Sequence, residues 1–194
     1  MNESKPAFID RIARAARSPF IYPALLLIEI LETTFVPIPY EAILIALVLA
    51  APERLWQFVA VSVLGSVIGG LILYFVGAGM AEPVAAFVGV ESEIATYRET
   101  FEQRGGALIF LAAVTPIPGY IVNIVAGASG YPVTAFLILI GVGRFLRFAV
   151  IGWLVARYGT VIVDRWMSLP RRLRWTLLAA LLVAATWWSL ASLS

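Results

Sequence analysis

The tripeptide Pro-Ile-Pro occurs twice inside apolar stretches of this chain, in "FVPIPYE" at 35–41 and in "VTPIPGY" at 114–120. Proline has no amide hydrogen, and its ring disfavours helix in the preceding residue, so each tripeptide interrupts any helix that contains it. Within a membrane, such non-helical backbone is tolerated only where it is buried in protein or lines a wet cavity. We therefore expect both breaks to face a cavity. The residues predicted to form them are Pro37, Pro39, Pro116, Pro118 and Gly119.

A membrane location is indicated by composition. Of the 194 residues, 61% are hydrophobic and 13% are charged, whereas a soluble domain has about 45–50% and about 25%. The sequence contains no cysteine and no histidine, so it lacks a thiolate nucleophile and also the commonest metal ligand and general base. We expect an integral membrane protein that is not an enzyme, with no metal and no cofactor, and nothing supports a nucleic-acid role.

The apolar segments fall into two length classes. Crossing about 30 Å of hydrocarbon takes about 20 helical residues. Three segments are long enough: 55–79, 133–156 and 173–193. Three others are too short: 40–51, 106–115 and 119–129. Because two short helices that meet at a break form a hairpin, we interpret 19–51 and 106–129 as re-entrant hairpins.

Charge placement predicts how the two hairpins are oriented. The N-terminal segment and the connection at 157–174 are rich in Arg and Lys, which predicts a cytoplasmic location, whereas the acidic segment 81–105 belongs outside. The first unit then enters from the cytoplasm and the second from outside. This is an inverted repeat, as in many secondary transporters. Two full crossings over 19–51 would give the same charge pattern, so segment length alone argues for hairpins.

The sequence therefore predicts an all-α membrane fold in which each re-entrant hairpin is followed by a transmembrane helix. We expect a basic amphipathic segment over 1–18 and a membrane domain over 19–172, with an amphipathic connector over 80–105. A C-terminal transmembrane helix is expected over 173–194.

Five charged residues lie where lipid would not tolerate them: Glu29, Glu32, Glu41, Arg144 and Arg147. Each ionisable group at the centre of a spanning helix costs about 2.5–3.5 kcal/mol, so these residues need partners or water. One interpretation is a set of Glu–Arg pairs that only fix helix packing. The other is a polar site in which arginine, whose planar fork donates two parallel hydrogen bonds, holds an anionic head group.

On the second interpretation, the substrate-binding candidates are Arg144, Arg147, Asn123 and Tyr40. Three carboxylates facing two arginines leave one carboxylate unpaired, and we expect it to carry a coupling proton. Glu32 is preferred because it lies nearer the first break than Glu29. Glu41 is the second choice, because the start of a helix stabilises its negative charge.

Two glycine motifs have simpler interpretations. "GSVIGG" at 65–70 is typical of a close helix-packing surface. "GASG" at 127–130 superficially matches the serine motif of rhomboid proteases, but without histidine the catalytic dyad cannot form. We expect that motif to be a turn that ends a short helix.

The motifs "ETTFVPIPYE", "GSVIGGLILYFVG" and "FEQRGGALIFLAAVTPIPGY" together resemble the DedA family, also called SNARE-associated or VTT-domain proteins, and look closest to its YqaA-like branch. The resemblance covers about residues 20–160. It implies two facing re-entrant hairpins and movement of undecaprenyl phosphate or phospholipid across the bilayer, often coupled to protons or sodium. By position, Glu32 and Glu41 match the acidic residues that flank the first break in the family.

The chain departs from the family pattern around the second break. Many DedA proteins have arginines there, where this chain has Ala112, Ala113, Tyr120 and Asn123. The head-group role therefore falls to Arg144 and Arg147 or is absent.

We accordingly expect a flippase or scramblase for an anionic lipid in the bacterial inner membrane, with membrane lipid as partner, H⁺ or Na⁺ as a coupling ion, and homo-oligomers allowed. The N-terminus is expected in the cytoplasm and the C-terminus in the periplasm. The alternative is a non-transporting scaffold or assembly factor whose buried charges are purely structural.

Overall fold

The structure is a computed structural model that describes residues 7–34, 38–88, 104–115 and 119–168. Three of the predicted break residues, Pro37, Pro116 and Pro118, lie outside these ranges, as does the predicted helix over 173–194. The chain divides into two compact units, Met1–Ala156 and Arg157–Ser194.

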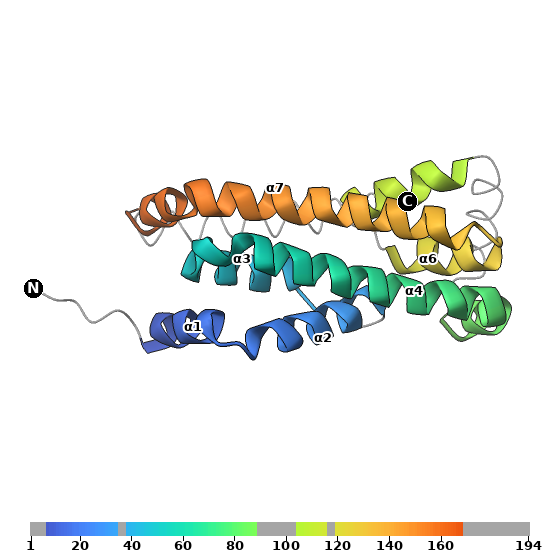
Figure 1. The fold of residues 1–194 in the computed structure, drawn as a ribbon, viewed down its shortest axis with the longest axis horizontal. Helices are drawn as coiled ribbons and strands as arrows, with labels where there is room; N and C mark the ends of the chain where they lie inside the picture. Colours follow the sequence, from blue (N-terminus) through green and yellow to red (C-terminus); the bar gives the residue numbers. More distant parts are fainter. Residues whose placement is uncertain (1–6, 35–37, 89–103, 116–118, 169–194) are drawn as a thin grey trace, which may run out of the picture. The chain divides into compact units, whose positions relative to one another are not determined.

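The described residues form helices and no strand, which confirms an all-helical fold for this part of the chain (Figure 1). In chain order the elements are α1 (Ala7–Arg17), α2 (Ile21–Thr34), α3 (Tyr40–Ala50), a 3₁₀ turn (Pro52–Arg54), α4 (Leu55–Val88), a helix over Arg104–Val114, α6 (Gly119–Ala128) and α7 (Val133–Ser168).

Two of the described helical stretches are long and apolar enough to cross a membrane, namely Pro52–Gly79 with 28 residues and Val133–Gly159 with 27. Both helices extend past the bounds predicted from hydropathy, α4 to Val88 and α7 to Ser168. The predicted boundaries followed the loss of apolar residues, but a helix ends where its backbone hydrogen bonding is interrupted. Met80, Ala81 and Glu82, which are good helix formers, follow Gly79, and α4 continues through them and past Pro83 to Val88.

Short apolar helices adjoin both breaks. Tyr40–Ala50 follows the first, and Arg104–Val114 and Gly119–Ala128 flank the second. A helix of 11 residues, such as α3, is about 16 Å long, roughly half of the hydrocarbon thickness. The predicted short helices are therefore present, and the order short helix, break, short helix, long helix occurs twice.

The end of α6 is built by glycine. Gly130 has φ +65°, in the left-handed region that a residue without a β-carbon adopts freely. Its N–H donates to Gly127 O at 3.0 Å, and the N–H of Tyr131 donates to Ala126 O at 3.0 Å. These two bonds form a Schellman motif. They confirm that "GASG" is a turn that ends a short helix.

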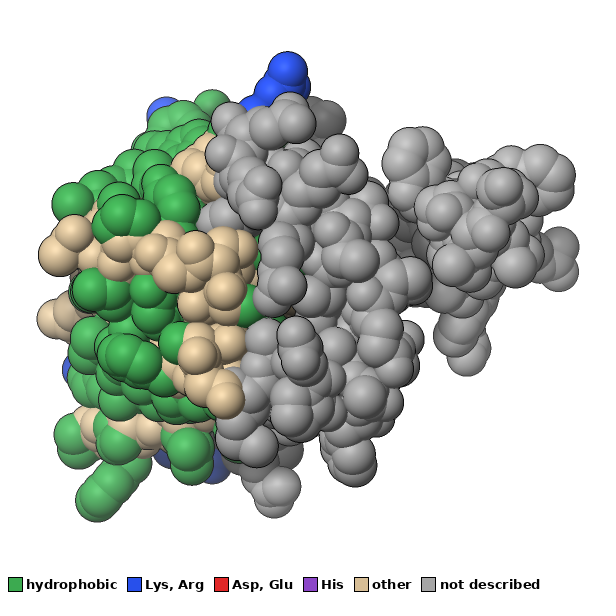
Figure 2. Space-filling view, turned by 90° about the vertical axis from the view of Figure 1, so that its right-hand side faces the viewer, with side chains coloured by type: hydrophobic (Ala, Val, Ile, Leu, Met, Phe, Trp, Pro, Cys, Tyr) green, Lys and Arg blue, Asp and Glu red, His purple; other side chains and the backbone are tan. Residues whose placement is uncertain are grey.

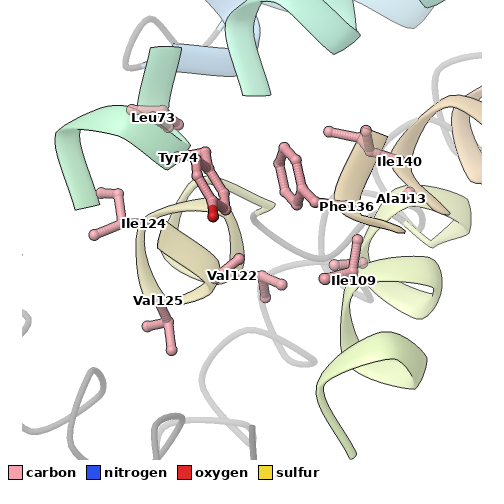
Figure 3. Close-up of a cluster of buried hydrophobic side chains, with 11 residues drawn as sticks. Leu73, Tyr74, Ile109, Ala113, Val122, Ile124, Val125, Phe136 and Ile140 are labelled. Atoms are coloured by element: carbon pink, nitrogen blue, oxygen red, sulfur yellow. The ribbon is translucent and has the colours of Figure 1, made fainter. Parts of the chain in front are cut away.

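Two hydrophobic cores lie in the first unit. The first core gathers α1 to α3, the start of α4 and Phe148 of α7. The second core gathers Leu73 and Tyr74 of α4, the helix over Arg104–Val114, α6, and Phe136 and Ile140 of α7 (Figure 3). Both long helices therefore contribute to both cores.

α4 and α7 run antiparallel through these cores. A β-carbon at Gly141 of α7 would lie 3.8 Å from Val67 of α4, whereas Gly152, later in α7, lies against Leu55 at the start of α4. As the residue number rises along one helix it falls along the other. Along the chain, α4 passes from the first core to the second, and α7 passes from the second core back to the first.

Glycines let the short helices approach α4 closely. A β-carbon at Gly65 would lie 2.8 Å from Glu29 Cβ, and one at Gly69 would lie 2.8 Å from Thr33 Cβ. These distances confirm "GSVIGG" as a packing surface, and its partner is α2. Gly127 plays the same part for α6, because a β-carbon there would collide with the backbone of Tyr74.

Many large hydrophobic side chains of the described residues in the first unit are exposed. Exposed large hydrophobic side chains include Leu64, Ile72 and Phe75 on α4, and Ile138 and Val142 on α7. In Figure 2 hydrophobic side chains cover much of the described surface on the face viewed, and Lys and Arg lie at its edges. Such a surface suits contact with lipid tails.

Candidate functional site

A layer of polar side chains separates the two cores; we call it the polar layer. Its buried members are Glu29 and Thr33 of α2, Ser62 and Ser66 of α4, Asn123 of α6 and Arg144 of α7. Its less buried members are Glu32, Glu41 and Arg147.

The polar layer lies halfway along the spanning helices. On α4, Ser62 and Ser66 stand between Phe58 of the first core and Leu73 of the second. Ser66 is at the middle of the Pro52–Gly79 stretch, and Arg144 and Arg147 flank the middle of Val133–Gly159. If these stretches span a bilayer, the layer is near its midplane.

Glu29 is fully buried. One carboxylate oxygen, Oε1, accepts a hydrogen bond from Ser66 Oγ and a longer one from Thr33 Oγ1 at 3.5 Å. The other oxygen, Oε2, has no hydrogen-bond partner among the described residues. Gly65, next to Ser66, makes room for this side chain because a larger residue would collide with it.

Arg147 connects the two breaks. Its Nη2 forms an ion pair with Glu41, in the first turn of α3, which begins after the first break. Its Nη1 donates to the backbone carbonyl of Thr115 at 2.8 Å, directly before the second break. The side chains of Arg147 and Glu41 are 13% and 32% exposed, so the pair is partly shielded from water. One guanidinium therefore links the start of α3 to the end of the helix over Arg104–Val114.

Arg144 is buried without a direct ion pair in the described part of the chain. It is 6% exposed, and its Nε has no hydrogen-bond partner there. It interacts electrostatically with Glu29, Glu32 and Glu41, although none of them is within ion-pair distance of it. Its Nη2 points toward the start of α6, 3.5 Å from where Gly119 would carry a β-carbon.

Asn123 adds a second unused donor. It is buried, and its Nδ2 lacks a partner among the described residues. This atom lies 3.5 Å from where Gly70 would carry a β-carbon, one helical turn from Ser66. Gly119 and Asn123 are one turn apart on α6 and share a face. Arg144 Nη2 and the Asn123 side chain therefore lie along one face of the first turns of α6, where a helix favours negative charge.

Tyr40 and Glu32 complete the predicted set. The hydroxyl of Tyr40 is hydrogen-bonded to Ser62 Oγ at 2.6 Å, and its ring lies 5.7 Å from that of Phe148, so Tyr40 faces the first core. Glu32 is half-buried and interacts electrostatically with Arg144 and Arg147.

All seven predicted binding and coupling residues thus belong to one region, and Pro39 and Gly119 stand where α3 and α6 begin. Their roles in binding and coupling remain predictions.

Sequence reasoning missed the hydroxyl residues. Ser62 and Ser66 were not singled out, although they lie four residues apart in an apolar span and hence on one face of α4. Thr33 was not singled out either. Thr115 gave no sequence signal, because it acts through its backbone oxygen.

Among the described residues, three buried atoms of the polar layer have no hydrogen-bond partner: the donors Arg144 Nε and Asn123 Nδ2 and the carboxylate oxygen Oε2 of Glu29. Guanidinium and amide N–H groups near a helix N-terminus suit an oxyanion such as phosphate. The carboxylate suits a proton. In the part of the chain that the structure describes, no group of three His, Cys, Asp or Glu residues is placed to hold a metal ion.

Comparison with known proteins identifies residues 38–157 as a VTT domain. A Haemophilus influenzae protein named "Uncharacterized protein" is 27% identical over 160 residues, which cover 81% of this chain and 83% of that protein. A Lactococcus lactis protein named "Alkaline phosphatase-like protein" is 28% identical over 160 residues, covering 76% of this chain and 73% of the relative. No solved structure matches the chain.

Proposed function

Since the chain belongs to the VTT-domain or DedA family, which is membrane-associated and linked to lipid transport, we propose that it moves an anionic lipid head group across the bilayer through the polar layer. The substrate is a phospholipid or undecaprenyl phosphate, and the protein acts as a flippase or scramblase. The observation that carries this proposal is Arg144, a buried arginine near the middle of the Val133–Gly159 stretch whose Nε has no hydrogen-bond partner among the described residues.

The physical argument concerns the cost of a buried charge. An arginine at the centre of a spanning helix is unfavourable by about 2.5–3.5 kcal/mol, and Arg144 makes no direct ion pair among the described residues. A phosphate entering the layer would satisfy its guanidinium with charge-assisted hydrogen bonds. Asn123 and the first turn of α6 would contact the same oxyanion. The layer thus replaces water around a head group that lipid tails cannot solvate.

The proposed architecture places the polar layer between two facing re-entrant hairpins, 19–51 and 106–129, arranged as an inverted repeat in the bacterial inner membrane. The N-terminus is then cytoplasmic, and the C-terminus is periplasmic if 173–194 forms a further span. The chain has no native cysteine, so single cysteines at the exposed positions Pro19 and Pro52 report sidedness directly. Labelling of both from the same side is the expected result, and labelling from opposite sides would replace the first hairpin by a full crossing.

Coupling in this proposal uses the carboxylates that Arg147 leaves unpaired. Glu41 is held by Arg147, which leaves Glu29 and Glu32 near Arg144. Glu29 is the more deeply buried of the two, and one of its oxygens has no hydrogen-bond partner among the described residues. We propose that a proton or sodium ion is exchanged at this pair when the head group binds or leaves.

The test is a head-group exchange assay in proteoliposomes with fluorescent phosphatidylglycerol and an impermeant quencher. We expect rapid exchange with the wild-type protein, at least tenfold slower exchange with Arg144→Gln, and partial recovery with Arg144→Lys. Arg157→Gln, which removes an exposed arginine, is the matched control and should leave the rate unchanged.

The alternative function is a scaffold in which the polar layer only secures packing. The hydrogen bonds of Glu29 and Arg147 suit a scaffold as well as they suit a transporter. Wild-type exchange no faster than in empty vesicles would support it. The name of the Lactococcus relative also raises hydrolysis of a phosphate ester, and release of phosphate from p-nitrophenyl phosphate by the purified protein would contradict a pure transporter.

A further inference from the structure

α1 is docked firmly on the rest of the first unit. Ala16 is fully buried in the first core. Arg54, in the turn before α4, donates to the carbonyl of Arg17 at 2.9 Å and to that of Ala16 at 3.4 Å. These carbonyls belong to the last turn of α1, so no N–H group within the helix donates to them. A guanidinium that caps them therefore fixes α1 to the start of α4.

This contact also sets the depth of α1 relative to a bilayer. Arg54 belongs to the Pro52–Gly79 stretch that is long and apolar enough to span, and it lies at that stretch's first turn. The C-terminal end of α1 is therefore at the level where hydrocarbon gives way to lipid head groups. Phe20, which follows α1, is 78% exposed. An exposed aromatic ring at this level suits insertion among lipids.

A surface pocket of about 510 Å³ opens at this end of α1, lined by Ala13, Arg14, Arg17 and Ser18. Arg14 is exposed, and Arg17 makes an ion pair with Glu53 at 3.2 Å in which both side chains are about half exposed. A pair so open to water is weak, so another anion can compete for Arg17. Ser18 Oγ accepts a hydrogen bond from Phe20 N at 3.3 Å, which leaves its O–H to donate outward.

We propose that this pocket is a peripheral binding site for the phosphate of an anionic phospholipid, held by Arg14, Arg17 and Ser18 while Phe20 contacts the acyl chains. Two guanidinium groups and a hydroxyl match a phosphodiester. The pocket lies at the level of the lipid head groups, and the exposed ring of Phe20 lies beside it. Both features favour a lipid over a free anion. The site is separate from the polar layer, and it does not depend on transport.

The test uses the detergent-purified full chain and native mass spectrometry, with titration by short-chain phosphatidylglycerol and, in parallel, phosphatidylcholine. The Arg144→Gln variant serves as the background, because it removes the donor proposed for the central site. In this variant we expect one phosphatidylglycerol to remain bound at the α1 pocket, in preference to phosphatidylcholine. Arg14→Gln should weaken this binding about fivefold, which corresponds to the ~1 kcal/mol expected per basic residue near an anionic surface. Arg157→Gln should have no effect.

A second variant makes the test independent of any loss of folding. Glu53→Gln frees Arg17 and should strengthen phosphatidylglycerol binding severalfold. Equal binding of phosphatidylcholine, unchanged affinity in both Arg14→Gln and Glu53→Gln, or complete displacement by millimolar inorganic phosphate would overturn the assignment. Loss of exchange in the transport assay with this binding intact would refute only the proposed function.

Discussion

Arg147 should contribute to the stability of the fold in a way that a surface arginine does not. Replacing it with Gln removes the ion pair with Glu41 and the charged hydrogen bond to the Thr115 carbonyl. Breaking a fully buried ion pair costs about 3–5 kcal/mol, and breaking an exposed one costs about 0.2–1 kcal/mol. Because the two side chains are 13% and 32% exposed, we expect a loss of about 2–3 kcal/mol.

The assay is a double-mutant cycle on apparent melting temperature in detergent, with Arg147→Gln, Glu41→Gln and the double variant. A loss of 2–3 kcal/mol corresponds to roughly 4–12 °C for a chain of this size. We expect the double variant to lose about 1–2 kcal/mol less than the sum of the single variants, because each single change strands the partner.

The matched control is the exposed pair Arg17–Glu53, whose side chains are 51% and 53% exposed. The same cycle on this pair should give a coupling below about 1 kcal/mol. If the losses from Arg147→Gln and Glu41→Gln simply added, or if both pairs gave equal coupling, the claim that Arg147 ties the breaks together would be wrong.

Three further predictions follow from individual contacts. Gly127→Ala should prevent stable folding, because its β-carbon would collide with the α4 backbone, whereas Gly79→Ala, with nothing within 4 Å, should be tolerated; yields of monodisperse protein distinguish them. Tyr40→Phe should lower the melting temperature by an amount equivalent to about 1 kcal/mol, through loss of its hydrogen bond to an α4 serine. Glu29→Gln should flatten the dependence of exchange rate on pH between about 5 and 8, while Glu53→Gln should preserve it; parallel profiles that differ only in height would remove Glu29 from coupling.

Among the described residues, most helices could be predicted from the sequence, because helix breaks and apolar spans depend on local chemistry. Proline marks the starts of α3 and α6, and glycine at 130 marks the end of α6. The apolar stretches Pro52–Gly79 and Val133–Gly159 lie close to the predicted spans 55–79 and 133–156, whereas α4 and α7 continue beyond them because a helix can extend past the point where hydropathy falls.

The candidate site was only partly predictable. Buried charges in apolar segments are conspicuous, so the residues around Arg144 were found from the sequence. Their pairing was not, because whether Glu41 or Glu29 meets Arg147 depends on packing between helices more than a hundred residues apart. The bond from Arg147 to the Thr115 carbonyl involves backbone, which carries no sequence signal.

On the proposed function, the polar layer is a wet binding site and not a sealed packing network. The most direct measurement is the rate at which a cysteine at Asn123 reacts with a water-soluble thiosulfonate in proteoliposomes, compared with a cysteine at Phe136 in the second core. We expect the cysteine at 123 to react much faster than the one at 136, and we expect phosphatidylglycerol or undecaprenyl phosphate, but not phosphatidylcholine, to slow it. Equal, negligible reaction at both positions, or a rate at 123 that is indifferent to anionic lipid, would contradict it.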